Sequence, residues 1–140
     1  MRNEIFLDTA YAIALSAESD DHHERAGRLA DQLESERTHI VTTRAVLLEI
    51  GNSLSKKPYR EAAVKLLDAL ERDPRVEIVS LSDELYAQAL ELFRSRPDKE
   101  WGLVDCASFI VMQNRGLTEA LTIDGHFEQA GFRPLLRDQS

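Results

Sequence analysis

Four acidic residues lie in segments of this chain that are otherwise apolar: Asp8, Glu49, Asp105 and Asp124. An ionised carboxylate in apolar surroundings is unfavourable unless a cation or hydrogen-bond donors compensate its charge. None of the four has a Lys or Arg directly beside it in the sequence. We therefore expect the compensating cation to be a metal ion. Asp8, which ends an apolar segment, has the fewest ordinary structural reasons to be there.

A group of carboxylates points to one chemistry in particular. Hard divalent cations such as Mg²⁺ and Mn²⁺ prefer oxygen ligands and bind substrate phosphate at the same time. One such ion, or two about 3.5–4 Å apart, activates water for in-line attack on phosphorus and stabilises the leaving oxygen. Thr9 and Thr122 lie close to the acids in the sequence, and we expect their hydroxyls to orient a carboxylate or a water. The sequence thus predicts metal-dependent hydrolysis of phosphodiester bonds.

Three of these acids also have an ordinary structural explanation. Asp105 lies near the start of a predicted helix and can cap it. Asp124 precedes a glycine, a pair of residues typical of turns. Glu49 can form an ion pair with Arg44 or Lys56 across a helix face. No single position is decisive, and the prediction rests on the set.

The elements that position the acids alternate along the chain between strands and helices. Short apolar segments predict strands at 5–7, 40–42, 76–79, 120–123 and 134–136. Helical periodicity predicts helices at 20–36, 45–54, 59–72, 83–93, 103–115 and 126–129. Such alternation implies a parallel sheet covered on both faces, with a ligand crevice at the carboxyl ends of its strands. Asp8 and Asp124 each close a predicted strand, so both are expected at that edge.

Composition limits the classes of function. The chain has 140 residues, no low-complexity stretch and no long linker, so we expect a single domain over residues 1–140. Its net charge of −8 disfavours a passive RNA- or DNA-binding module, because phosphates are repelled at long range. A nuclease is not excluded, because bound cations reverse the local charge. One cysteine, no signal peptide and no apolar run of membrane-spanning length favour a cytoplasmic protein without membrane contact.

Several short motifs, taken in order, resemble those of PIN-domain proteins, above all the VapC ribonuclease toxins of toxin–antitoxin pairs. The similar segments are 6–10, 43–52, 103–109, 120–127 and 129–132. The resemblance implies a three-layer α/β/α fold with a central parallel sheet of about five strands. It also implies Mg²⁺ or Mn²⁺ dependence, endonucleolytic cleavage of RNA, a homodimer and inhibition by a small cognate antitoxin protein.

The resemblance also assigns roles to individual residues. Asp8, Glu49 and Asp105 match the three main metal-binding acids, and Asp124 matches a fourth, more variable one. His126 falls where many relatives carry a further acid, which leaves open whether a second metal would be held. A loop residue without a role is the default expectation for His126.

Other features have weaker interpretations. Adjacent histidines at 22–23 point in different directions on a helix and do not predict a zinc site. Trp101 is a candidate for stacking on a base or for a protein contact, and Cys106 is expected in the core. Two basic clusters are either phosphate-binding patches or ordinary solvated surface. They consist of Arg44, Lys56, Lys57 and Arg60, and of Arg94, Arg96 and Lys99.

Two other functions are compatible with this fold class. A phosphotransferase using Asp8 as a nucleophile would need an acid two residues later, where the chain has Ala10. A non-catalytic scaffold, or a regulatory subunit that binds RNA or protein, would keep the fold without the chemistry. The helices after Asp20 and around Tyr59 are a candidate groove for a partner segment.

Overall fold

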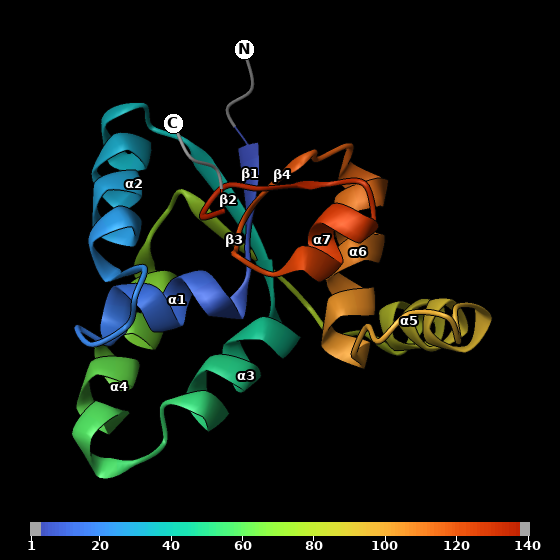
Figure 1. The fold of residues 1–140 in the computed structure, drawn as a ribbon, viewed down its shortest axis with the longest axis horizontal. Coiled ribbons are helices and arrows are strands. Elements are labelled where there is room, and N and C mark those ends of the chain that lie inside the picture. Colours follow the sequence, from blue (N-terminus) through green and yellow to red (C-terminus); the bar gives the residue numbers. More distant parts are fainter. Residues whose placement is uncertain (1–3, 138–140) are drawn as a thin grey trace.

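A parallel sheet of five strands lies at the centre of the protein, in the order β3-β2-β1-β4-β5. The computed structural model describes residues 4–137, which contain all of these strands (Figure 1). The strands are β1 (Glu4–Leu7), β2 (His39–Thr43), β3 (Val76–Val79), β4 (Glu119–Leu121) and β5 (Arg133–Pro134). Residues 1–3 and 138–140, at the ends of the predicted domain, lie outside the described part.

The central strands are apolar because helices cover the sheet on both faces. Phe6 of β1, Val41 of β2 and Leu121 of β4 are completely buried. Strand β1 pairs with β2 on one side and with β4 on the other, with Leu7 in register with Leu121. The carboxyl ends of β1 and β4 are therefore neighbours, as the predicted crevice requires.

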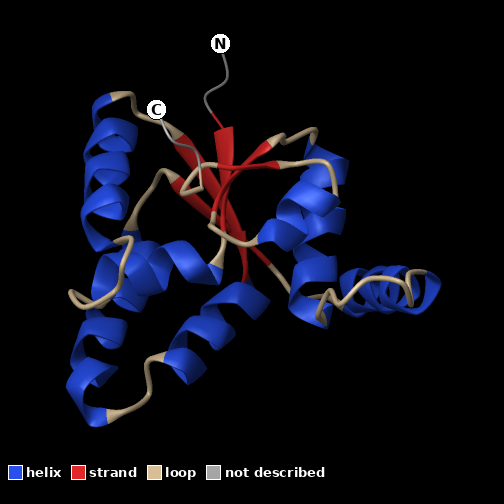
Figure 2. Cartoon of the chain, in the orientation of Figure 1, coloured by secondary structure: helices blue, strands red, loops and turns tan. Residues whose placement is uncertain are grey.

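Seven helices surround the sheet in the described part of the chain. They are α1 (Thr9–Ser16), α2 (His23–Ser35), α3 (Arg44–Ser53), α4 (Lys57–Arg72), α5 (Asp83–Ser95), α6 (Leu103–Arg115) and α7 (Gly125–Gln129). Helices α1, α2 and α4 lie on one side of the sheet, and α5, α6 and α7 lie on the other (Figure 2). The predicted three-layer α/β/α fold is therefore confirmed. None of the described helices is long and apolar enough to span a membrane.

Helix α1 is absent from the predicted elements. Its sequence is apolar almost throughout, and Tyr11, Ala12 and Ala14 are all buried. A helix that is buried on several sides lacks the apolar stripe of period 3.6 by which surface helices are recognised. Asp8 precedes the helix but makes no side-chain cap hydrogen bond, so the usual N-terminal signature is missing as well.

Two predicted boundaries differ in the structure, and the first of them concerns the site. Strand β4 ends at Leu121 rather than at residue 123, so Thr122 lies in the loop that leads to Asp124. Pro58 separates α3 from α4 as predicted, but it lies in the first turn of α4, where its missing N–H is not needed.

The predicted buried faces of α3 and α5 are partly wrong. Leu48 is 61% exposed, Tyr86 is 48% exposed and Phe93 is 45% exposed. Leu85 and Ala89 are the buried residues of α5, which packs against α6 and projects from the body of the molecule (Figure 1). Periodicity correctly predicted an apolar stripe on α5, but the buried stripe is shifted around the helix toward Leu85.

Candidate active site

Asp8 lies at the carboxyl end of the central strand β1, where it is 4% exposed. Its backbone N–H donates to the carbonyl of Leu121, which continues the pairing of β1 with β4 by one residue. The Thr122 hydroxyl donates to Asp8 Oδ2 at 2.8 Å. The same hydroxyl accepts from the Asp124 backbone N–H at 3.0 Å. Thr122 therefore fixes both Asp8 and the loop that carries Asp124, as expected of a hydroxyl that orients a carboxylate.

Burial raises the pKa of Asp8 to about 7, well above its ordinary value. Hydrogen bonds from Thr122 and from the Thr9 backbone oppose this rise, whereas the negative charges of Asp105 and Glu49 add to it. No Lys or Arg of the described residues forms an ion pair with Asp8. A buried carboxylate in this position gains most from a bound cation.

Glu49 faces the site from α3. The Thr9 hydroxyl donates to Glu49 Oε1 at 2.6 Å, so α1 and α3 are linked directly beside Asp8. The alternative pairing of Glu49 with Arg44 is not formed, because the Arg44 guanidinium binds Glu71 instead. Both threonines that flank the acids thus orient a carboxylate.

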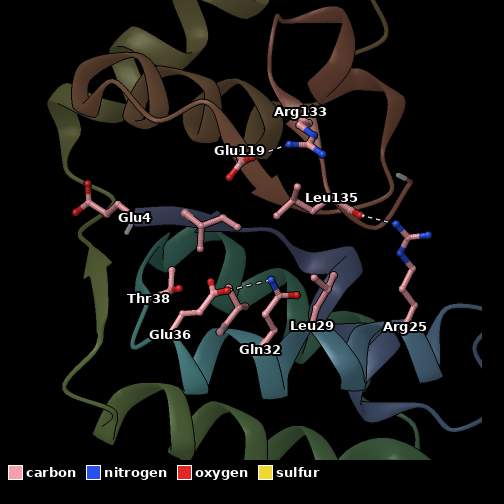
Figure 3. A pocket seen from close by; sticks show the side chains of 11 residues that line it. Glu4, Arg25, Leu29, Gln32, Glu36, Thr38, Glu119, Arg133 and Leu135 are labelled. Atoms are coloured by element: carbon pink, nitrogen blue, oxygen red, sulfur yellow. Dashed lines mark hydrogen bonds and ion pairs between the residues drawn. The ribbon is translucent and has the colours of Figure 1, made fainter. Parts of the chain in front are cut away.

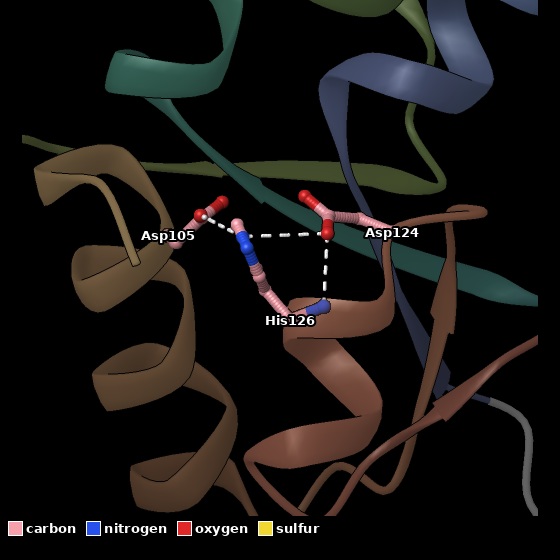
Figure 4. Close-up of side chains that lie close together, drawn as sticks. All are labelled: Asp105, Asp124 and His126. Atoms are coloured by element: carbon pink, nitrogen blue, oxygen red, sulfur yellow. Dashed lines mark hydrogen bonds and ion pairs between the residues drawn. The ribbon is translucent and has the colours of Figure 1, made fainter. Parts of the chain in front are cut away.

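Asp105, Asp124 and His126 form a tight cluster in which one ligand atom of each lies within 4.8 Å of the others (Figure 4). His126 Nδ1 is 3.2 Å from Asp105 Oδ2 and 3.4 Å from Asp124 Oδ1. The His126 ring therefore lies between two carboxylates that come from α6 and from the loop after β4.

The ordinary roles expected for the two acids of this cluster are also present. Asp105 Oδ2 accepts from the Gly102 backbone N–H at 3.2 Å and so caps α6. Asp124 Oδ1 accepts from the His126 backbone N–H at 2.8 Å and caps α7. Burial raises the pKa of Asp105, although the Gly102 N–H and His126 oppose the rise. Capping fixes these carboxylates in place and leaves each with a second oxygen.

The structure brings the four predicted acids to one edge of the sheet, but it does not place them equally. Asp105 and Asp124 lie in the tight cluster with His126. Asp8 and Glu49 lie outside this cluster: Thr122 joins Asp8 to the loop that carries Asp124, and Thr9, the residue after Asp8, holds Glu49. The expectation that His126 is a loop residue is wrong, because it lies in the first turn of α7 beside Asp105 and Asp124. A lone histidine two residues after an acid has no diagnostic pattern in a sequence.

The donor set fits a divalent metal ion. The residues present offer carboxylate oxygens from the end of β1, from α3, from α6 and from the loop after β4, together with one imidazole nitrogen, in partly or fully buried positions. Such ligands are those that Mg²⁺ and Mn²⁺ accept, and the charge of the ion would offset the mutual repulsion of the acids.

Two other residues noted in the sequence belong to the core. Trp101 is 6% exposed, and its Nε1–H donates to Gln129 Oε1 at 3.0 Å. Its ring packs edge-on against Phe109 at 5.0 Å between centroids. The buried ring is therefore not exposed for stacking on a base, the first of the two roles considered for Trp101. Cys106 is fully buried as predicted, and burial raises the pKa of its thiol to about 11.

A pocket of about 290 Å³ lies at the opposite edge of the sheet, at the amino ends of β1 and β4 (Figure 3). Glu4, Thr38 and Glu119 line it together with residues of α2, among them Arg25 and Gln32. The acid cluster lies at the carboxyl ends of the same strands. This pocket is therefore separate from the predicted crevice.

The parallel sheet order and the acids at its carboxyl edge define the class of protein to which the chain belongs. Residues 5–133 match the model of the PIN domain. The chain is a member of the PIN-domain family, as the resemblance in its motifs indicated.

Within this family the chain is similar to VapC20 of Mycobacterium tuberculosis, described as a 23S rRNA-specific endonuclease. The two are 32% identical over 128 residues, which cover 91% of this chain and 95% of VapC20. The crystal structure of VapC20, described as a Sarcin-Ricin loop cleaving toxin, matches with a TM-score of 0.81 at 31% identity and the same coverage. The predicted similarity to the VapC ribonuclease toxins is therefore confirmed.

More distant structures share the fold. VapBC2 from Rickettsia felis, bound to a DNA fragment from its promoter, has a TM-score of 0.64 at 17% identity and covers 94% of this chain and 96% of that chain. FitAcB from Neisseria gonorrhoeae has a TM-score of 0.60 at 18% identity and covers 93% and 94% of the two chains.

Proposed function

We propose that this protein is a metal-dependent endoribonuclease that hydrolyses RNA phosphodiester bonds and acts as the toxin of a toxin–antitoxin pair. The observation that carries the proposal is the buried carboxylate of Asp8, held by Thr122 beside Asp105 and Glu49 without a basic partner among the described residues. Its membership in the PIN-domain family and its similarity to VapC20 support the same activity.

In this proposal Asp8, Glu49, Asp105 and Asp124 hold Mg²⁺ or Mn²⁺. The ion supplies an activated water and neutralises charge on the phosphate. The chain's own part is to fix the carboxylates: Thr122 holds Asp8, and Thr9 holds Glu49. Pre-oriented carboxylates need no rearrangement when the ion and the RNA phosphate arrive.

The substrate and partners follow from the relatives. VapC20 is described as acting on 23S rRNA, so ribosomal RNA is the first substrate to test. We also propose a small cognate antitoxin, a homodimer and a cytoplasmic location. The exposed apolar residues Tyr86 and Phe93 on the projecting helix α5 support a homodimer, because such side chains are commonly covered in an assembly.

The experiment that tests the activity uses purified protein, RNA and added Mg²⁺ or Mn²⁺, with EDTA as the metal-free reference. We expect cleavage only with metal, and we expect Asp8→Asn and Asp105→Asn each to abolish it. Asp68→Asn is the matched control, because this acid is exposed on α4 and pairs with Arg72.

Retained cleavage in both site variants would overturn the assignment of the site. If no RNA is cut, a Mn²⁺ titration distinguishes the remaining cases. A non-catalytic scaffold has no saturable Mn²⁺ site that Asp8→Asn removes.

A further inference from the structure

We propose that His126 is a metal ligand of this site and that its nitrogen shifts the preference of the site from Mg²⁺ toward Mn²⁺. The inference rests on the proposed metal-dependent function and specifies which ion the site favours. It starts from the position of the His126 ring, whose Nδ1 lies 3.2 Å from Asp105 Oδ2 and 3.4 Å from Asp124 Oδ1. A nitrogen at this position is close enough to both carboxylates to share an ion with them.

Residue 126 is held firmly in this orientation. Its backbone N–H donates to Asp124 Oδ1, so backbone and ring both contact the same carboxylate. The next residue, Phe127, is completely buried, and its ring lies 4.9 Å from that of Phe109 and 6.3 Å from that of Phe6. These contacts fix α7 against α6 and β1, and they aim His126 into the site (Figure 4).

His39 provides a comparison for His126, because it also lies between two carboxylates. His39 Nε2 is 3.5 Å from Glu4 Oε2 and 3.6 Å from Glu77 Oε1. There, however, the Arg115 guanidinium binds Glu77 and compensates its charge. No Lys or Arg of residues 4–137 forms an ion pair with Asp105 or Asp124. Asp105 and Asp124 therefore lack the basic side-chain partner that Arg115 provides to Glu77 beside His39.

The type of ligand atom determines whether the site binds Mg²⁺ or Mn²⁺ more tightly. Mg²⁺ binds carboxylate and water oxygens, whereas first-row transition ions, Mn²⁺ included, gain more from an imidazole nitrogen. An aspartate at position 126 would add an oxygen ligand and a negative charge, both of which favour Mg²⁺. A histidine there provides neither, and so it lowers the affinity for Mg²⁺ more than that for Mn²⁺.

The test compares the metal-free wild-type protein with His126→Ala, His126→Asp and the control His39→Ala. Isothermal titration with Mn²⁺ and with Mg²⁺ gives the ratio of the two dissociation constants. Pulsed electron paramagnetic resonance of the Mn²⁺-loaded protein detects a coordinated nitrogen directly. Circular dichroism checks that each variant is folded.

We expect nitrogen coupling in the wild type and in His39→Ala, and its loss in both His126 variants. His126→Ala should weaken Mn²⁺ binding about tenfold or more. His126→Asp should restore Mg²⁺ binding and lower the preference for Mn²⁺. Because His126→Asp keeps a ligand in place, it tests the proposal even if His126→Ala does not fold.

The failures of the two proposals are distinguishable. Mn²⁺ bound in a manner that depends on Asp8, but without nitrogen coupling, would overturn the role of His126 and leave the nuclease proposal standing. Absence of any saturable Mn²⁺ site would overturn both.

Discussion

The hydroxyl of Thr122 donates a hydrogen bond to the carboxylate of Asp8, a residue 114 positions away in the sequence. The same oxygen accepts from the backbone of Asp124, so one side chain connects the ends of β1 and β4. Among the described residues, Thr122 provides the hydroxyl that is hydrogen-bonded to Asp8. The position of the buried acid therefore depends on a residue that itself has no charge.

We expect Thr122→Val to reduce cleavage because Asp8 loses the hydrogen bond that orients it. A loss of 10–100-fold in kcat/KM is typical when a group that orients a metal ligand is removed. Thr42→Val is the matched control: Thr42 is also completely buried, and its hydroxyl donates to the Leu7 carbonyl rather than to an acid. Both variants should lose about 1 kcal/mol of unfolding free energy. Equal cleavage by the two would contradict the role of Thr122.

The raised pKa of Asp8 predicts a pH-dependent stability of the metal-free protein. In the folded state this pKa is about 7, and its ordinary value is 3.8. Between these values the folded state binds a proton that the unfolded state releases, so stability falls as pH rises from about 4 to about 7. Asp8→Asn removes this loss and should be more stable than the wild type at pH 8, by an amount on the order of a few kcal/mol.

Thermal melts in EDTA across this pH range measure the effect. The difference in Tm between Asp8→Asn and the wild type should grow with pH and level off above pH 7. Added Mn²⁺ should stabilise the wild type and not the variant. A difference in Tm between the two proteins that stays constant from pH 4 to pH 8 would contradict the raised pKa of Asp8.

The basic cluster near α4 gives a prediction about RNA binding. Arg44 binds Glu71, and the Arg60 guanidinium donates to the Ser55 carbonyl, so Lys56 and Lys57 are the members to change. Replacing both with Ala should weaken RNA binding and lower its salt slope by about 1.4, the value for two contacts to single-stranded phosphates.

Binding is measured in EDTA, which prevents cleavage, at several salt concentrations. Lys65→Ala, on the exposed side of the same helix, is the control and should leave the slope unchanged. A slope unaffected by the Lys56 and Lys57 changes would identify this cluster as ordinary solvated surface.

Trp101→Phe should destabilise the protein without affecting RNA binding. The change removes the hydrogen bond to Gln129 and leaves space beside Phe109. We expect a loss of about 1–3 kcal/mol in the free energy of unfolding, measured by urea denaturation. A large loss of RNA affinity in a variant of normal stability would restore the stacking role that burial of the indole argues against.

The proposed homodimer predicts an effect of charges on α5. Tyr86→Arg and Phe93→Arg should convert a dimer into a monomer, because an arginine cannot be covered without a partner for its charge. Sedimentation velocity measures the change. Val64→Arg, an exposed apolar position on α4, is the control and should remain dimeric. A wild-type protein that sediments as a monomer would argue against the homodimer itself.

The sequence predicted the strands and the sheet edge because buried strands and strand-end acids leave local patterns. It did not predict α1, whose apolar sequence lacks amphipathic periodicity. It also misplaced the exposed side chains of α5, because periodicity shows that a helix has an apolar face but not which neighbour covers it.

The four acids could be proposed from the sequence because each is a charged residue in an otherwise apolar segment. The arrangement around His126 could not, because it depends on contacts between distant parts of the chain. His126 contacts Asp105 in a structure where the next residue, Phe127, packs against Phe109 of the same helix as Asp105. A single histidine carries no local sign of such packing.

The central position of β1 also bears on when activity can arise during synthesis. The acids extend from residue 8 to residue 124, and the hydroxyl that holds the first of them belongs to residue 122. A growing polypeptide therefore has an incomplete centre until nearly all of this span has left the ribosome. On the proposed assignment, a product that ends before residue 122 lacks both Asp124 and the hydroxyl that holds Asp8, so we expect it not to cleave RNA.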